Sequence, residues 1–244
     1  MASIPVLLCF TAVLISLFPE NGQGQSIESL SVSLKKIQEE IVNKHNELRR
    51  SVSPTASNML KMKWSKEAAA NAQRWADQCT LSHSTQQHRE ISTSNCGENL
   101  FMASYPATWS KAIQDWYDES KDFIYGKGPK TSHAVIGHYT QVVWYSSSLV
   151  GCGISYCPNS ILKYYFVCQY CPAGNLRSKL HVPYLSGPPC ASCPNDCDNG
   201  LCTNSCKYID KYSNCKSLVK TVGCTHDITK DGCQASCKCQ DKIY

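Results

Sequence analysis

The chain has 244 residues, a net charge of +5 and 17 cysteines. A charge this modest excludes the strongly basic surface that nucleic-acid binding requires, so nucleic acid is not an expected partner. So many cysteines would be unusual in a reducing cytosol and are typical of secreted proteins that are stabilised by disulfides.

The first segment in chain order is an almost unbroken apolar run over residues 4–18, followed by small and polar residues. This pattern predicts a secretory signal peptide over residues 1–24, with cleavage near Gly24. At about 15 residues, the run is shorter than the roughly 20 apolar residues of a transmembrane helix. We therefore expect a secreted, extracellular protein.

Three amphipathic helices are predicted after this segment. Apolar residues recur at helical intervals over residues 33–52. A second helix follows Ser65, which is a plausible N-cap, and a third starts after Thr108.

Some polar and aromatic residues of these segments are expected to be structural. His45 stands on the apolar face of the first helix, where a buried role in the core is favoured over a ligand role. Asn46 and Arg49 are expected to cap or bridge neighbouring elements. The tryptophans supply bulk for burial and are expected in the core; they are Trp64, Trp75, Trp109, Trp116 and Trp144.

Two later segments, 149–156 and 162–170, are rich in β-branched and aromatic residues, and a turn-like sequence at 157–160 separates them. They predict an antiparallel hairpin. Because helices come first and strands later, without β-α alternation, the fold class is α+β, with helices packed on a small antiparallel sheet.

The cysteines divide the chain into two kinds of structure. Without Cys9, which lies in the predicted signal peptide, 16 remain, an even number that can pair completely. Six lie from Cys79 to Cys171 and ten lie from Cys190 to Cys239. The part before Cys190 is long enough to bury a core, whereas the part after it needs cross-links. The Cys190-x-x-Cys193 pair by itself would also suit structural zinc, but a signal peptide favours disulfides.

A turn-rich connector, LSGPP at 185–189, separates the two parts. Residues 190–244 contain seven Lys and six Asp and are nearly neutral.

Four motifs point in order to one family: HNELR at 45–49, GENL at 97–100, GHYTQVVW at 137–144 and YFVCQYCPAGN at 165–175. Together they resemble the signature of the cysteine-rich secretory protein, antigen 5 and pathogenesis-related superfamily. The cysteine spacing after residue 205 resembles the ion-channel-regulatory module that ends the vertebrate members. The chain is thus similar to mammalian-type cysteine-rich secretory proteins from about residue 35 onward.

This resemblance implies an α-β-α sandwich, the SCP domain, over 25–185, then a disulfide-bonded hinge over 186–205 and a small helical cysteine-rich module over 206–244. It also implies a disulfide connectivity that spacing alone leaves open. The implied pairs are Cys79–Cys157, Cys96–Cys171, Cys152–Cys168, Cys190–Cys197, Cys193–Cys202, Cys206–Cys239, Cys215–Cys233 and Cys224–Cys237.

The resemblance further groups His83, Glu98, Glu119 and His138 in one cleft of the larger domain. Two imidazoles can hold Zn²⁺ at about 2.0–2.1 Å, while the carboxylates either ligate the metal or orient the rings. A weakly bound, regulatory Zn²⁺ is the cofactor expected. The alternative is a crevice in which these polar groups only satisfy one another.

The expected function is binding and regulation rather than catalysis. The partners that the resemblance implies are an ion channel or a cell-surface or secreted protein, with roles in sperm maturation, sperm–egg interaction, or exocrine and innate defence. Lys207-Tyr208 and Lys211-Tyr212 each place a cation beside an aromatic ring, a pairing that could enter a pore mouth. The alternative is that they are ordinary surface residues of a small module.

Two other functions stay open. A lipid or sterol carrier would use an apolar groove or a flexible loop; the segment 125–136 has the composition of a loop but few apolar residues. A metal-dependent hydrolase would need a nucleophile, a base and an orienting group. Ser84 or the serines at 146–148 could serve, but the chain has neither a Gly-x-Ser-x-Gly nor a His-Glu-x-x-His motif.

Overall fold

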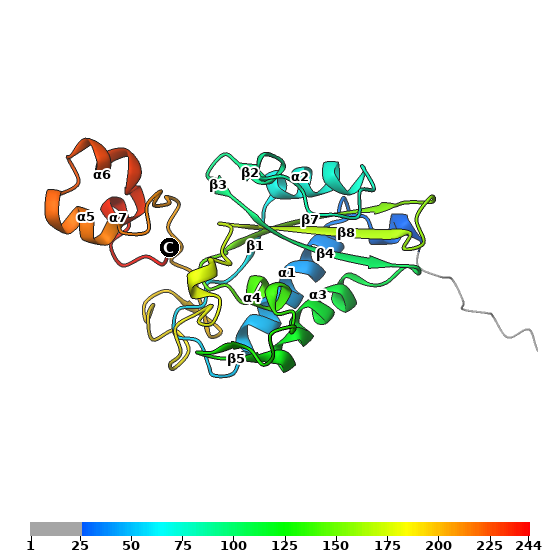
Figure 1. The fold of residues 1–244 in the computed structure, drawn as a ribbon, viewed down its shortest axis with the longest axis horizontal. Helices are drawn as coiled ribbons and strands as arrows, with labels where there is room; N and C mark the ends of the chain where they lie inside the picture. The colour runs from blue at the N-terminus through cyan, green and yellow to red at the C-terminus, as the bar shows by residue number, and fades with distance from the viewer. Residues whose placement is uncertain (1–25) are drawn as a thin grey trace, which may run out of the picture.

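The computed structural model describes residues 26–244, so the predicted signal peptide lies outside the described residues. Over that range, every helix is too short or too polar to cross a bilayer. The chain first forms a layered body and then a small group of helices, α5 to α7, at one end of the molecule (Figure 1).

The three predicted helices are present as α1 (Lys35–Arg50), α2 (Lys66–Ala76) and α3 (Trp109–Asp118). Ser65 Oγ accepts a hydrogen bond from the backbone N–H of Ala68, and Thr108 Oγ1 accepts one from that of Lys111. Ser65 is therefore the N-cap that the sequence predicts, and Thr108 caps α3 in the same way. A further helix, α4 (Gly137–Val142), lies within the GHYTQVVW motif.

The predicted hairpin consists of β7 (Leu149–Tyr156) and β8 (Tyr164–Cys171). It belongs to a four-stranded sheet in the order β1-β7-β8-β4, in which β4 (Gly97–Ala103) pairs antiparallel with β8. The edge strand β1 (Lys63–Trp64) pairs parallel with β7. The sheet is thus antiparallel except for one two-residue edge strand, which is too short to show periodicity in the sequence.

Helices cover both faces of this sheet and complete the α-β-α arrangement (Figure 1). Val150, Cys152 and Ile154 of β7 pack in one core with α1, α3 and α4. On the other face, α2 lies against Gly151 and Gly153, where an added Cβ would overlap the backbone of the helix. Glycine is required at these positions because helix and strand approach closely.

The polar residues of α1 have the structural roles expected for them. His45 is fully buried. Asn46 bonds both the N–H and the C=O of Met62. The buried Arg49 donates to four backbone carbonyls, those of Leu60, Val142, Trp144 and Tyr145. Four of the tryptophans are buried and Trp64 is half-buried.

The remaining elements are short. They are η1 (Ile27–Leu30), η2 (Gln86–Arg89), β2 (Glu90–Ile91), β3 (Ser94–Asn95), η3 (Glu119–Asp122), β5 (Phe123–Ile124), β6 (Gly128–Pro129), η4 (Arg177–Lys179), β9 (Cys197–Asp198), β10 (Leu201–Cys202), α5 (Cys215–Val222), α6 (Asp227–Gly232) and α7 (Gln234–Lys238). The predicted loop at 125–136 therefore contains a strand, β6, which pairs with β5.

The segment expected to act as a hinge is docked on the larger body. Leu201 is fully buried in the main core, and Cys202 exchanges backbone hydrogen bonds with Met59 and Lys61. Lys61 also forms an ion pair with Asp198. These contacts hold the β9–β10 hairpin against the body, so that this segment is not a free linker.

Residues 206–244 form the three short helices α5, α6 and α7, whose cysteines are cross-linked. The last residues return to the larger body: Ile243 packs with Leu60 and with cysteines of the hinge, and Tyr145 Oη donates to the Tyr244 carbonyl at 2.9 Å. Within residues 26–244 the structure contains eight disulfides, which join the pairs that the resemblance implies.

Candidate functional site

The first half of the candidate cleft is built around Glu98 on β4, whose carboxylate is buried. Its Oε1 lies 2.9 Å from His83 Nδ1 and accepts the Ser84 backbone N–H at 2.9 Å. Its Oε2 accepts the Ser84 hydroxyl at 2.7 Å. The His83 side chain is 55% exposed, so its ring reaches solvent while its Nδ1 edge is held by the carboxylate.

Glu98 is ionised despite its burial. Burial by itself would raise the pKa of this carboxyl group, but hydrogen bonds from His83 and from both groups of Ser84 outweigh it, with help from Arg89. The pKa of Glu98 is consequently lowered from its ordinary value. Because an ionised carboxylate can only accept, the proton of the neutral His83 ring is on Nδ1, and Nε2 keeps its lone pair.

The second half pairs Glu119, at the end of α3, with His138 on α4. Glu119 Oε1 lies 2.7 Å from His138 Nδ1, and Oε2 accepts the backbone N–H groups of His138 and Tyr139 at 2.9 and 3.1 Å. The same carboxylate therefore caps the first turn of α4 and orients the ring. Asn99 on β4 donates to the His138 carbonyl at 3.1 Å and fixes the other side of that residue.

The two halves meet at β4, because Glu98 holds His83 and the next residue, Asn99, holds the main chain of His138. Each ring has its Nδ1 engaged by a carboxylate, which is the arrangement found behind histidine ligands of zinc. Within residues 26–244, no three of the four predicted ligands have donor atoms all within 4.8 Å of one another. The geometry therefore suits carboxylates that orient the rings better than four direct ligands.

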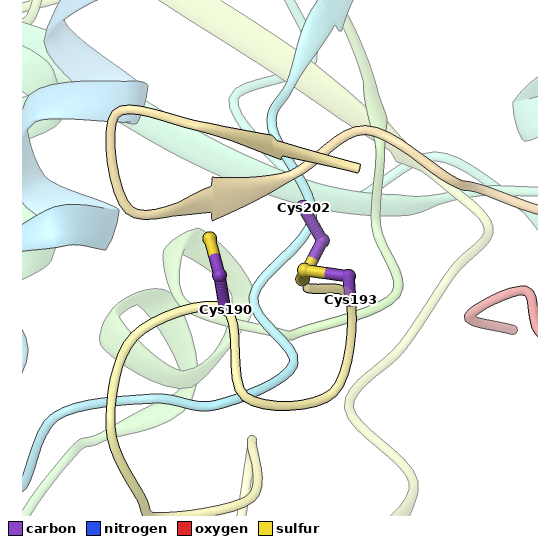
Figure 2. Close-up of side chains that lie close together, drawn as sticks. All are labelled: Cys190, Cys193 and Cys202. Atoms are coloured by element: carbon purple, nitrogen blue, oxygen red, sulfur yellow. A yellow bond between two sulfur atoms is a disulfide. The ribbon is translucent and has the colours of Figure 1, made fainter. Parts of the chain in front are cut away.

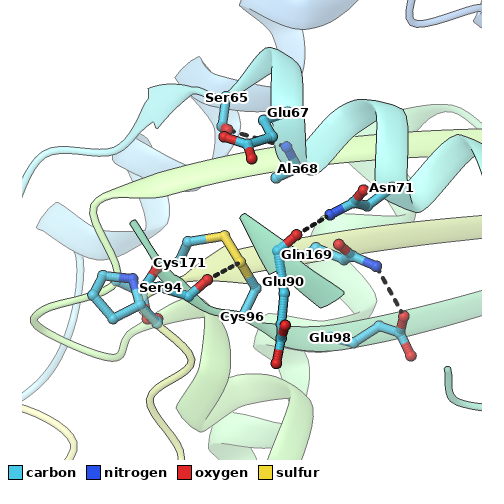
Figure 3. Close-up of a disulfide and its surroundings, with 12 residues drawn as sticks. Ser65, Glu67, Ala68, Asn71, Glu90, Ser94, Cys96, Glu98, Gln169 and Cys171 are labelled. Atoms are coloured by element: carbon cyan, nitrogen blue, oxygen red, sulfur yellow. Dashed lines mark hydrogen bonds between the residues drawn. A yellow bond between two sulfur atoms is a disulfide. The ribbon is translucent and has the colours of Figure 1, made fainter. Parts of the chain in front are cut away.

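Gln169, Arg89 and Asn99 adjoin this cleft and were not singled out in the sequence. Gln169 is fully buried opposite Glu98 in the β4–β8 register, with Nε2 3.5 Å from Glu98 Oε2 (Figure 3). Arg89 Nη1 lies 4.0 Å from Glu98 Oε1. Asn99 and Gln169 had a local signal, their places in the GENL and YFVCQYCPAGN motifs, whereas Arg89 is placed only by the path of its loop.

The serines weighed as nucleophiles are engaged elsewhere. The Ser84 hydroxyl donates to Glu98, and the Ser147 hydroxyl donates to the Pro172 carbonyl. Among the described residues, neither these hydroxyls nor those of Ser146 and Ser148 bond a histidine ring. The hydrogen-bond sequence that activates a serine nucleophile is therefore not assembled around these residues.

A second group of potential metal ligands occurs in the hinge, where the sulfur atoms of Cys190, Cys193 and Cys202 lie within 4.8 Å of one another. Figure 2 shows Cys193 and Cys202 joined by a disulfide, and Cys190 is bonded to Cys197. Metal binding by cysteine requires a thiolate, so these oxidised sulfurs are not a zinc site.

The predicted partner-binding residues separate into two groups in the structure. Lys207 Nζ lies 5.3 Å from the centre of the Tyr208 ring, and Lys238 Nζ of α7 lies 4.5 Å from it. Lys238 was not identified from the sequence, since 30 positions separate it from Tyr208. Lys211 and Tyr212 are exposed, but Tyr212 packs against Gly232, and no cation–π contact joins the two within the described residues.

The segment 125–136 begins with a tyrosine held against the larger body and later lines a polar pocket. Tyr125 stacks 5.2 Å from Tyr184 and donates to its carbonyl oxygen. The pocket beside this segment is mainly acidic; it is lined by Asp115, Asp118, Glu119, Lys121, Asp122, His133, Ala134 and Val135.

Comparisons with known proteins agree with these observations. A family model described as "Cysteine-rich secretory protein family" matches residues 42–170, and one described as "Crisp" matches residues 190–244. Over the full length of both chains, the sequence is 59% identical to cysteine-rich secretory protein 2 and to cysteine-rich secretory protein 3 of Homo sapiens. It is 53% identical, again over 100% of each chain, to the cysteine-rich venom protein helothermine of Heloderma horridum horridum.

Two solved structures share the fold of the larger body. NaASP2 with Zn²⁺ is 30% identical with a TM-score of 0.58, and the match covers 70% of this chain and 96% of that one. Na-ASP-1 is 31% identical with a TM-score of 0.57, and the match covers 68% of this chain but only 46% of Na-ASP-1.

Proposed function

Because the chain belongs to the cysteine-rich secretory protein family, we propose that it is secreted and acts by binding an ion channel or a cell-surface protein, without catalysing a reaction. Sperm maturation, sperm–egg interaction and exocrine or innate defence are the processes in which we place this binding.

The observation that carries this proposal is the construction of residues 206–244. Three disulfides close three short helices around few buried side chains. The segment contains seven Lys and four Asp and neither Arg nor Glu, so that its surface is positive. A cross-linked backbone loses little conformational freedom on contact, which lowers the cost of binding.

Within it, Lys207, Tyr208 and Lys238 form what we call the lysine–tyrosine cluster. The Tyr208 ring is half-buried and attracts both ammonium groups, while the two lysines are exposed. Two positive charges are thereby held close together on a rigid support. Such a cluster is complementary to the rings of carboxylates or carbonyl oxygens at the mouth of a cation channel.

We also propose a functional division at the boundaries 25–185, 186–205 and 206–244. The docked hinge and the Tyr145–Tyr244 hydrogen bond support a fixed presentation of the module by the larger body. The larger body is then available for a second partner.

The test is to apply full-length protein to patch-clamped target cells and to compare it with a Lys207→Ala, Lys238→Ala variant. We expect the variant to lose most of the current block, whereas Lys127→Ala, at an exposed lysine of the larger body, should behave as the unmodified protein. Equal block by all three proteins would place the regulatory surface outside the lysine–tyrosine cluster.

For the larger body, we propose a regulatory Zn²⁺ held by the Nε2 atoms of His83 and His138. The support is geometric: a glutamate engages Nδ1 of each ring, which leaves Nε2 as the atom that could bind the ion. The ion would cross-link the 83–84 loop to α4. The related structure that is described with Zn²⁺ is consistent with this assignment.

A further inference from the structure

Exposed apolar side chains gather at the end of the sheet where β7 turns into β8. Ile161 in the turn is 90% exposed and Leu162 is 41% exposed, and Tyr156, at the end of β7, is 44% exposed. The register aligns Ala103, Tyr156 and Tyr164 across the three strands, so Tyr105, which follows β4 and is 53% exposed, comes to the same end. The hairpin tip is defined by Ile161, Leu162 and Lys163 together with Tyr105, Tyr156 and Tyr164.

The hairpin tip is rigidly supported. Cys157, at the start of the turn, is bonded to Cys79, which follows α2. The Cys157 N–H donates to the Lys163 carbonyl and the Ser160 N–H donates to that of Cys157. Tyr156 and Tyr164 stack edge to face, 5.3 Å apart. The exposed Ile161 is therefore not a residue that folds back into the core.

The charge that the hairpin itself carries is of one sign, while Asp77 at the end of α2 accepts a hydrogen bond from Ser155, next to Tyr156. No Asp or Glu occurs between Asp122 and Asp196, a stretch that includes all of β7 and β8. Lys163 is exposed in the turn itself. Exposed apolar side chains next to Lys163, in a hairpin that has no carboxylate, are complementary to a surface whose exterior is anionic and whose interior is apolar.

We propose that the hairpin tip docks on an anionic phospholipid bilayer. Ile161 and Leu162 would enter the acyl boundary, the tyrosines would lie at the level of the headgroups, where their amphipathic rings are favoured, and Lys163 would contact lipid phosphates. A narrow convex point suits a bilayer better than a globular partner, because a stable protein interface needs on the order of 800 Å² from each side. This proposal does not rest on the function proposed above, since α5 to α7 lie at the opposite end of the molecule (Figure 1).

The experiment is co-sedimentation of the full chain with vesicles of phosphatidylcholine alone or of phosphatidylcholine mixed with phosphatidylserine. We expect retention by the anionic vesicles, a loss of roughly tenfold or more in Ile161→Glu, and a loss of about fivefold in Lys163→Ala. The matched control is Val135→Glu, a β-branched residue that is 61% exposed elsewhere, which should bind as the unmodified chain. Unchanged circular dichroism spectra would show that each variant is folded.

The depth to which the hairpin tip enters the bilayer is measured by tryptophan fluorescence in the variants Ile161→Trp and Val135→Trp. Brominated lipids in the vesicles should quench the fluorescence of the added tryptophan only in Ile161→Trp. The proposal is overturned if the unmodified chain stays in solution with anionic vesicles, or if Ile161→Glu and Val135→Glu are retained equally. Equal retention by the two kinds of vesicle would overturn the assignment to anionic lipid. If the chain bound a protein partner through Ile161 but did not bind vesicles, the proposal of membrane docking would also be overturned.

Discussion

His45 Nε2 lies 2.9 Å from the hydroxyl oxygen of Tyr170, and His45 Nδ1 lies 2.8 Å from the carbonyl oxygen of Ile41. Since a carbonyl can only accept, Nδ1 of the neutral ring carries the proton and Nε2 accepts from the tyrosine. Burial, with a smaller contribution from the positive charge of Arg49, lowers the pKa of His45 to about 4. The α1 helix is thus joined to β8 through a histidine that is neutral in the folded protein.

This pairing predicts a loss of stability in acid. The pKa of His45 is about 4 when folded and 6.5 as its ordinary value, so the unfolded chain binds the proton more readily. The contribution is fully present above pH 6.5 and is lost as the pH falls from 6.5 to about 4, by roughly 3 kcal/mol in total. Urea unfolding measured at steps across this range checks the prediction.

The variant His45→Gln tests whether this residue is responsible. It should be less stable at neutral pH and should show a weaker pH dependence above about pH 4.5, the ordinary pKa of Glu98. His133→Gln, at an exposed position of the larger body, is the control and should keep the full slope. An unchanged slope in His45→Gln would assign the acid sensitivity to other groups.

Gly151→Ala should destabilise the larger body, because the new methyl group would overlap the backbone of α2 at Ser65 and Ala69. Overpacking of this kind costs about 1–3 kcal/mol, and backbone atoms can yield less than side chains. Gly137→Ala is the matched control, since nothing lies within 4 Å of the added Cβ. Thermal unfolding of both variants measures the difference in stability. If the Gly151→Ala protein were as stable as the control, the close approach of α2 to β7 would be contradicted.

Mild reduction should unfold residues 206–244 before the larger body. Each disulfide contributes roughly 2–4 kcal/mol, and the terminal helices have little packing to replace that contribution, whereas the larger body keeps its sheet and helices. Increasing dithiothreitol followed by limited proteolysis and mass spectrometry would show which part is cleaved first. A single transition for both parts would mean that the contacts of Ile243 and Tyr244 couple them into one cooperative unit.

Zinc binding, if the two-histidine assignment is correct, should be abolished in a His83→Ala, His138→Ala variant and weakened about 10–100-fold in Glu119→Gln, which removes the orienting charge. Titration calorimetry with Zn²⁺ measures both effects. His133→Ala, in the neighbouring acidic pocket, is the control and should bind as the unmodified chain. If the double variant bound Zn²⁺ with the same affinity as the unmodified chain, the zinc site could not lie in this cleft.

The candidate cleft of the larger body shows why only part of the site could be predicted from the sequence. The pairing of His83 with Glu98 depends on a loop that returns to β4, and that of Glu119 with His138 depends on how α3 meets α4. The family resemblance placed these four residues together, whereas their spacing along the sequence gives no sign that they are close in space. Gln169 lies in the YFVCQYCPAGN motif, but its place opposite Glu98 depends on the strand register. A one-residue slip would turn its side chain to the other face of the sheet.

The sequence by itself determined the features that neighbours along the chain control. Ser65 and Thr108 begin helices because their oxygens reach N–H groups three residues on. The 149–170 hairpin follows from two segments rich in β-branched and aromatic residues on either side of a turn. Only the tertiary structure decided the burial of Leu201 against the body, the contact of Lys238 with Tyr208 and the exposure of Ile161. These depend on which surfaces the folded chain brings together, and that choice is made by packing between distant segments rather than by local backbone preference.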